Sequence, residues 1–114
     1  MINEEAKMYI DAAIEKEKNA AIEKHSYFNS NHEFWAVIKE EIEELEYEFE
    51  PQFLDKFIRE SWLSIKADKG INQSYLQHLK TMAKRVAVEA VQVAAVINKY
   101  SEGVKDVNGK TKEG

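Results

Sequence analysis

The glutamate at position 41 points in an unusual direction for a charged residue. On a helix of 3.6 residues per turn, Glu41 falls inside an apolar face, whereas Glu43 and Glu46 point away from it. That face consists of Phe34, Ile38, Ile42, Leu45 and Phe49. Glu44 and Glu48 continue from Glu41 along one flank, and Glu40 lies further round the same flank. An inward carboxylate needs a partner, because burial of an unpaired charge is costly.

A second inward glutamate occurs later in the chain. Glu89 lies within the apolar face formed by Met82, Val86, Val93, Ile97 and Tyr100, and Gln92 follows it by one turn. If the two apolar faces meet, Glu41, Glu44 and Glu89 converge, and carboxylates at short range cannot all stay ionised without a cation. Oxygen ligands suit hard divalent ions, so we expect a site for Mg²⁺, with Mn²⁺ as a substitute.

Simpler interpretations compete with a metal site. Glutamates on a charged helix usually form a solvated face, and the spacing Glu-x-x-Glu arises on any such helix. Glu41 could also pair with Lys39 or Arg85. Trp35, at the edge of the apolar face, is more typical of a core residue than of a platform for a nucleobase.

Four helices would position these residues. Apolar spacing and end signals predict them over Asn3–Lys24, His32–Phe49, Pro51–Ala67 and Asn72–Tyr100. Ser30 and Glu33 have the spacing of a capping box before the second helix. We expect one all-α domain over residues 1–100, followed by a polar, flexible tail over residues 101–114.

Glycine signals mark two of the predicted helix ends. Gly70 follows the third helix, and Gly103 follows the fourth. The fourth helix carries Val88, Val91 and Ala95 outside its main apolar face, so we expect it to be buried nearly all round and to contribute to an oligomer interface.

The composition excludes several classes of function. The 114 residues are 44% hydrophobic, enough for one domain with a core, and contain no cysteine for a disulfide or a thiolate site. Acidic residues outnumber basic ones by 21 to 16, and no basic stripe is present, which argues against duplex nucleic acid as a partner. The charged N-terminus and the lack of a long apolar run predict a protein without a membrane span.

Two segments resemble the MazG-like family of all-α nucleoside triphosphate pyrophosphohydrolases, especially its short phage-type members. The segment from Phe28 to Leu45 is similar to the family's EExxE helix, with Glu40, Glu41 and Glu44 at the glutamate positions. The segment from Glu89 to Val96 is similar to its later ExxD helix. Gln92 stands where the family has Asp, and the gap between the two motifs is long.

The resemblance implies a four-helix MazG-like bundle that forms a dimer or tetramer. It also implies Mg²⁺-dependent hydrolysis of a nucleoside or deoxynucleoside triphosphate to the monophosphate and pyrophosphate, in the cytoplasm of a bacterial or phage-infected cell. Glu41, Glu44, Glu89 and Gln92 would bind the metal.

The remaining roles follow from the same expected chemistry. Glu40 or Glu44 would accept the proton of the attacking water, while Lys39, Arg85 and Lys99 would hold the phosphates and Trp35 would stack on the base. The alternative function is a catalytically weakened helical module of the same fold, which binds a nucleotide or a protein. An unrelated helical assembly protein is a third alternative.

Overall fold

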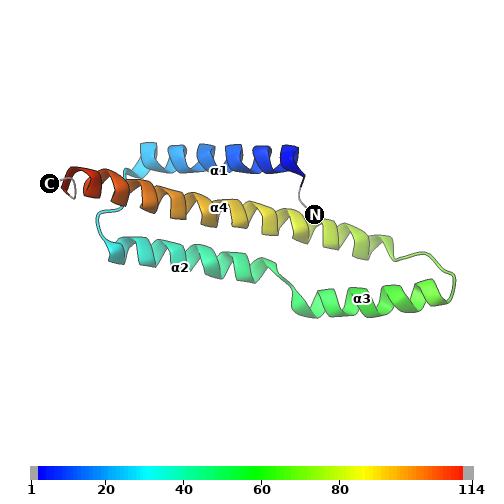
Figure 1. Ribbon diagram of the computed structural model, residues 1–114. Coiled ribbons are helices and arrows are strands. Elements are labelled where there is room, and N and C mark those ends of the chain that lie inside the picture. Colours follow the sequence, from blue (N-terminus) through cyan, green and yellow to red (C-terminus); the bar gives the residue numbers. More distant parts are fainter. Residues whose placement is uncertain (1–2, 112–114) are drawn as a thin grey trace.

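The computed structural model describes residues 3–111, and the side chains of residues 3–104. This part of the chain forms helices and contains no strand, so the predicted all-α fold is confirmed. The helices are α1 (Glu4–His25), α2 (Asn31–Glu48), α3 (Pro51–Lys66) and α4 (Gln73–Thr111). Figure 1 shows α4 as the long central helix, with α1 along one side and α2 followed by α3 along the other.

Side chains at the helix starts explain where α1 and α2 begin. The Asn3 carboxamide accepts a hydrogen bond from the Ala6 N–H at 3.0 Å. Ser30 Oγ accepts from the Glu33 N–H at 3.1 Å, as the predicted capping box requires. The Glu33 carboxylate accepts a hydrogen bond from the Asn29 N–H at 3.1 Å. In an ideal capping box the donor would be the N–H of Ser30, the next residue.

The link between α3 and α4 corrects one glycine prediction. Asp68, with φ 59°, takes the left-handed conformation after α3, whereas Gly70 has no positive φ. Aspartate tolerates this conformation better than most residues because its short side chain bonds locally. Asn72 then caps α4, where its side-chain oxygen accepts from the Tyr75 N–H at 3.2 Å.

Helix α4 continues beyond the predicted end at Tyr100. It runs to Thr111, so the prediction that this helix ends at Tyr100 is wrong, and residues 112–114 lie outside the described part. Gly103 is a buried helical residue here and not a stop signal. A Cβ at Gly103 would lie 3.0 Å from Tyr27 Cδ1, so the glycine allows the tyrosine ring to approach the helix closely.

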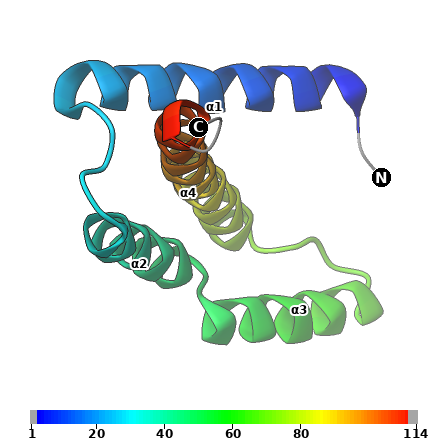
Figure 2. The same cartoon turned by 60° about the vertical axis from the view of Figure 1, so that its left-hand side comes forward.

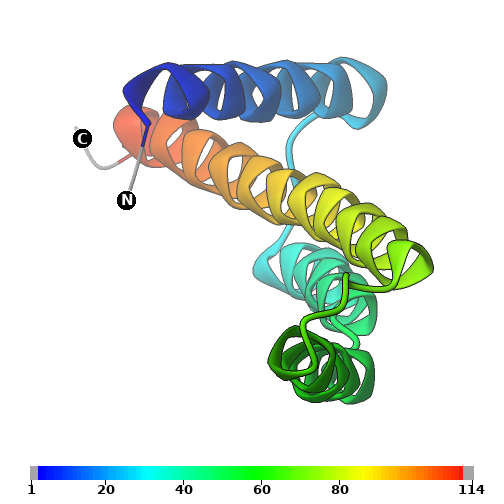
Figure 3. The ribbon, with the colours of Figure 1, turned by 90° about the vertical axis from the view of Figure 1, so that its right-hand side faces the viewer.

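Polar contacts attach α1 to the C-terminal part of α4. The buried Lys18 ammonium binds the Glu102 carboxylate, and the Tyr27 hydroxyl donates to the same carboxylate at 2.8 Å. These partners raise the pKa of Lys18 and lower that of Glu102. Figure 2 shows α1 lying across the C-terminal part of α4, and Figure 3 shows α1 on the side of α4 away from α2 and α3.

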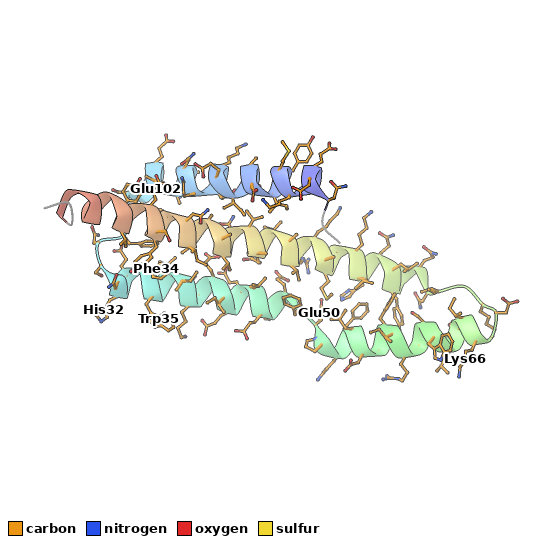
Figure 4. All side chains as sticks on the ribbon, in the orientation of Figure 1. His32, Phe34, Trp35, Glu50, Lys66 and Glu102 are labelled. Carbon is orange, nitrogen blue, oxygen red and sulfur yellow. The ribbon has the colours of Figure 1, made fainter. Side chains whose placement is uncertain are left out.

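Helices α2 and α4 are antiparallel neighbours. The Phe34 and Tyr100 rings stack at 4.0 Å between centroids, and the Tyr100 hydroxyl donates to the Asn31 carboxamide at 2.7 Å. At the other end of α2, a ring nitrogen of His78 lies 3.0 Å from a Glu50 oxygen. Figure 4 shows Phe34 between the two helices and Trp35 on a side of α2 away from α4.

Helix α3 extends the molecule and does not close a bundle. It lies beyond the end of α2 and meets the N-terminal part of α4 through Phe53, whose ring packs against those of Tyr75 and His78. The radius of gyration is 19.5 Å, against about 13 Å for a compact domain of similar length. The four-helix bundle expected from the sequence is therefore not seen within one chain.

The described residues bury only a small core. Ile38, Met82 and Ala95 are its buried apolar residues, with Ala95 only 4% exposed beneath α1. Val88 and Ile97 are 57% and 43% exposed, so a single chain does not bury the fourth helix nearly all round. In the described residues no helix combines the length and the apolar character required to span a bilayer.

Candidate metal centre

The contact between α2 and α4 brings three glutamates together. One carboxylate oxygen from each of Glu41, Glu44 and Glu89 lies within 4.8 Å of the other two. Glu41 and Glu44 lie one turn apart on α2, and the antiparallel packing places Glu89 of α4 opposite them. The predicted convergence of these three residues is confirmed, and three oxygen ligands at this spacing can hold a divalent cation.

Burial makes this cluster different from a solvated glutamate face. Glu41 and Glu89 are partly buried, and Oε2 of each is a buried atom without a hydrogen-bond partner. Within the described residues no lysine or arginine forms an ion pair with the three glutamates. The predicted alternative, in which Lys39 or Arg85 neutralises Glu41, is therefore wrong.

The electrostatics of the cluster favour protonation when no cation is bound. Burial raises the pKa of Glu41, and the charges of Glu44, Glu89 and Glu40 raise it further. Burial also raises the pKa of Glu89, and Glu44 and Glu48 add to this shift. A divalent cation would reverse these effects, because it stabilises the ionised carboxylates that these surroundings destabilise.

Two further glutamates of α2, Glu40 and Glu48, lie next to the cluster. Glu40 is exposed one turn before Glu44 and is close enough to affect the pKa of Glu41. Glu48 is one turn after Glu44, and its charge contributes to the raised pKa of Glu89. The sequence places Glu48 on the glutamate flank, but we did not select it as a site residue. Its position at i+4 from Glu44 was the available signal, since residues four apart share a helix face.

Of the predicted phosphate-binding residues, Lys39 and Lys99 lie away from the cluster. Lys39 pairs with Glu43 at 2.9 Å on the solvent side of α2. Lys99 is buried, with its ammonium 4.3 Å from the centroid of the Phe28 ring. It is also about 15 Å further along α4 than Glu89, at 1.5 Å per residue. Arg85 is exposed one turn before Glu89 and remains a candidate.

The predicted base-stacking role of Trp35 does not fit a single chain. Glu44 is nine positions after Trp35, which places the two half a turn out of phase, on opposite sides of α2. Trp35 is 61% exposed on its side. It therefore does not lie beside the carboxylates.

Gln92 lies one turn beyond Glu89 and lines a hollow of about 280 Å³ between α1 and α4. The walls include Ala20, Ala21, Ala95 and Val96, and Lys24 and His25 line the same space. Gln92 thus connects the carboxylate cluster to a partly apolar space that Lys24 and Glu17 of α1 also line. Sequence reasoning did not identify Lys24 or His25, because nothing in their spacing shows that the end of α1 lies over α4.

No protein-family model, curated protein or solved structure matches this chain. The assignment of a function therefore depends on the residues and on the geometry described above.

Proposed function

We propose that this chain is a Mg²⁺-dependent nucleoside triphosphate pyrophosphohydrolase of the MazG-like type. The observation that carries the proposal is the carboxylate cluster, in which Glu41 and Glu89 each have a buried oxygen without a partner. The motifs around Glu40, Glu41, Glu44 and Glu89 support it, because the residues that resemble the family's metal-binding positions are those that converge in space.

The charge of the cluster determines what kind of substrate it can accept. A triphosphate carries about four negative charges, so the bare glutamates would repel it. A Mg²⁺ ion held by them would remove this repulsion and would supply polarisation of the phosphate oxygens. Glu41, Glu44 and Glu89 would hold the ion. Water adds to the α-phosphorus, the bond to the bridging oxygen breaks, and the products are a nucleoside monophosphate and pyrophosphate.

The surrounding residues fit the other requirements of this reaction. Glu40, exposed beside the cluster, would accept the proton of the attacking water. The hollow beside Gln92 would receive the nucleotide, since its alanine and valine walls suit a flat base or a sugar. Lys24, which lines the hollow with Gln92, and Arg85, one turn before Glu89, would bind phosphate oxygens.

Calorimetric titration with Mg²⁺ or Mn²⁺ tests the metal site. We expect Glu41→Gln and Glu89→Gln each to weaken binding at least tenfold, which corresponds to about 1.4 kcal/mol. Glu46→Gln is the matched control, because Glu46 is an exposed glutamate on the same helix as Glu41. Equal affinities in all three variants would place the metal elsewhere.

Pyrophosphate release from a panel of nucleoside triphosphates tests the reaction. We expect turnover with Mg²⁺ and at least a tenfold loss of kcat in Glu40→Gln, with metal affinity little changed, because Glu40 is not one of the three converging ligands. A Glu40→Gln variant with full turnover would exclude this residue as the base.

Gln92 favours one alternative, a nucleotide-binding module with weakened catalysis. An amide in place of the family's aspartate can coordinate through its oxygen but adds no charge to the site. Metal and nucleotide binding without pyrophosphate release would support this alternative. Turnover gained in Gln92→Asp would then identify the missing charge as the cause.

A further inference from the structure

The hollow between α1 and α4 has charged residues of opposite sign along its α1 wall. Glu17 and Lys24 both line it, together with Ala20 and Ala21, which lie between them in the sequence. The spacing i, i+3, i+4 and i+7 places these four residues on one face of α1. Glu17 and Lys24 are about 10 Å apart along the helix axis. This wall therefore offers a carboxylate, a stretch of methyl groups and an ammonium group in turn.

Neither of these charged residues is neutralised by a neighbour. Within the described residues Glu17 and Lys24 form no ion pair, whereas Lys18, directly after Glu17, is paired with both Glu15 and Glu102. Glu17 and Lys24 are also exposed side chains. Both are therefore available to a molecule that enters the hollow.

The opposite wall of the hollow belongs to α4 and leads to the carboxylate cluster. It consists of Gln92, Ala95 and Val96. Gln92 is one turn after Glu89, and under the proposed function, on which this inference rests, Lys24 would hold phosphate oxygens. The separation of Lys24 and Glu17 along α1 is similar to that between the α-phosphate of a nucleotide and the far edge of its base. The base would then lie between alanine side chains, with that edge at Glu17.

Glu17 offers only hydrogen-bond acceptors to this edge. An ionised carboxylate has two acceptor oxygens side by side and no donor. Guanine matches it, because its N1–H and its 2-amino group are adjacent donors on the Watson–Crick edge. Adenine and cytosine have one amino group next to an acceptor nitrogen, and uracil and thymine have one N–H between two carbonyl oxygens. Each of these four bases therefore places a lone pair against one carboxylate oxygen.

We propose that the hollow selects guanine nucleotides and that Glu17 recognises the base. Its carboxylate accepts hydrogen bonds from N1–H and from the 2-amino group, while alanine side chains of both helices pack against the ring. Two parallel hydrogen bonds to one base discriminate between bases better than a single bond does. Helix α1 thus supplies the base specificity of a site whose converging carboxylates lie on α2 and α4.

Calorimetric titration with nucleoside monophosphates in the presence of Mg²⁺ tests the base preference without requiring turnover. We expect GMP to bind at least tenfold more tightly than AMP and than IMP, which lacks only the 2-amino group of GMP. Glu17→Gln should abolish this preference, because its amide places a donor against one of the two guanine donors. Glu23→Gln is the matched control and should keep the preference, since Glu23 is an exposed glutamate of α1 that does not line the hollow.

Pyrophosphate release distinguishes a failure of this proposal from a failure of the proposed function. We expect kcat/KM for GTP to exceed that for ITP at least tenfold, and Glu17→Gln to remove the difference. Equal kcat/KM for GTP, ITP and ATP would overturn the selection of guanine and leave the hydrolysis in place. Tighter binding of GMP without pyrophosphate release from any triphosphate would support the selection and overturn the hydrolysis. A preference that survives in Glu17→Gln, or that Glu23→Gln also abolishes, would overturn the role of Glu17.

Discussion

At the scale of residues, Glu41 and Glu89 oppose folding when no cation is present. Both pKa values are raised above the ordinary 4.5, first by burial and then by neighbouring carboxylates. A carboxyl group whose pKa is higher in the folded state binds its proton more tightly there than in the unfolded chain. The resulting stability is fully present below pH 4.5 and is lost as the pH rises through the folded-state pKa values.

The direction of this pH dependence predicts how the removal of one charge changes stability. In the absence of metal, Glu89→Gln should increase the free energy of unfolding at neutral pH by roughly 1 kcal/mol, because the amide carries no charge to bury. It should also reduce the loss of stability between acidic and neutral pH. Urea unfolding with a chelator over a series of pH values measures both effects.

Two comparisons make this experiment decisive. Glu46→Gln, at an exposed position, should change neither the stability nor its pH dependence. A Glu89→Gln protein that is less stable by the same amount at every pH would show that Glu89 has a packing role and that its charge is unimportant.

The sequence predicts inward-facing glutamates more reliably than it predicts the partners of lysine side chains. Glu41 and Glu89 are recognisable because they break an apolar period, and that period is set by the helix itself. Lys39 and Lys99 are different. Their flexible side chains reach Glu43 and the Phe28 ring, and which of several neighbours such a side chain binds depends on packing that periodicity does not describe.

At the scale of elements, the helix starts were easier to predict than the ends. Ser30 and Asn72 cap α2 and α4 through hydrogen bonds within one turn, which the local sequence encodes. Gly70 and Gly103 failed as stop signals for different reasons. Asp68 takes the left-handed position before Gly70, and Gly103 is needed in a helix because Tyr27, far away in sequence, packs against it.

A double-mutant cycle can measure this role of Gly103. Alanine in place of a helical glycine normally adds about 1 kcal/mol of stability. Gly103→Ala should give no gain, or a loss, in the wild-type chain, because its Cβ would meet the Tyr27 ring at 3.0 Å. In a Tyr27→Ala background the same change should stabilise by about 1 kcal/mol, as measured by urea unfolding. Equal effects in both backgrounds would mean that the ring does not restrict this position.

At the scale of the whole molecule, periodicity predicted which helices exist but not which of their faces meet. The helical period of 3.6 residues placed Ile42, Phe49 and Ile97 on the apolar faces expected between α2 and α4, yet the structure leaves all three exposed. An apolar stripe wider than one contact can serve two neighbours, and the amphipathic pattern is the same whether the second neighbour belongs to the same chain or to another. Helix α3, strongly amphipathic but attached at few points, is the clearest example.

Both tryptophans of the chain, Trp35 and Trp62, lie on exposed sides of α2 and α3, where they are 61% and 59% exposed. The family resemblance implies a dimer or tetramer, and association through this side of α2 would cover Trp35. The emission should then shift to shorter wavelength as the protein concentration rises. Ile42→Glu, seven residues after Trp35 on the same side of α2, should abolish this shift, whereas Tyr47→Glu should not. Emission that is independent of concentration in an associating protein would mean that the indoles stay in water. Because Trp35 faces away from the carboxylates, titration with Mg²⁺ should leave the spectrum unchanged, so the natural fluorescence of the chain reports assembly separately from metal binding.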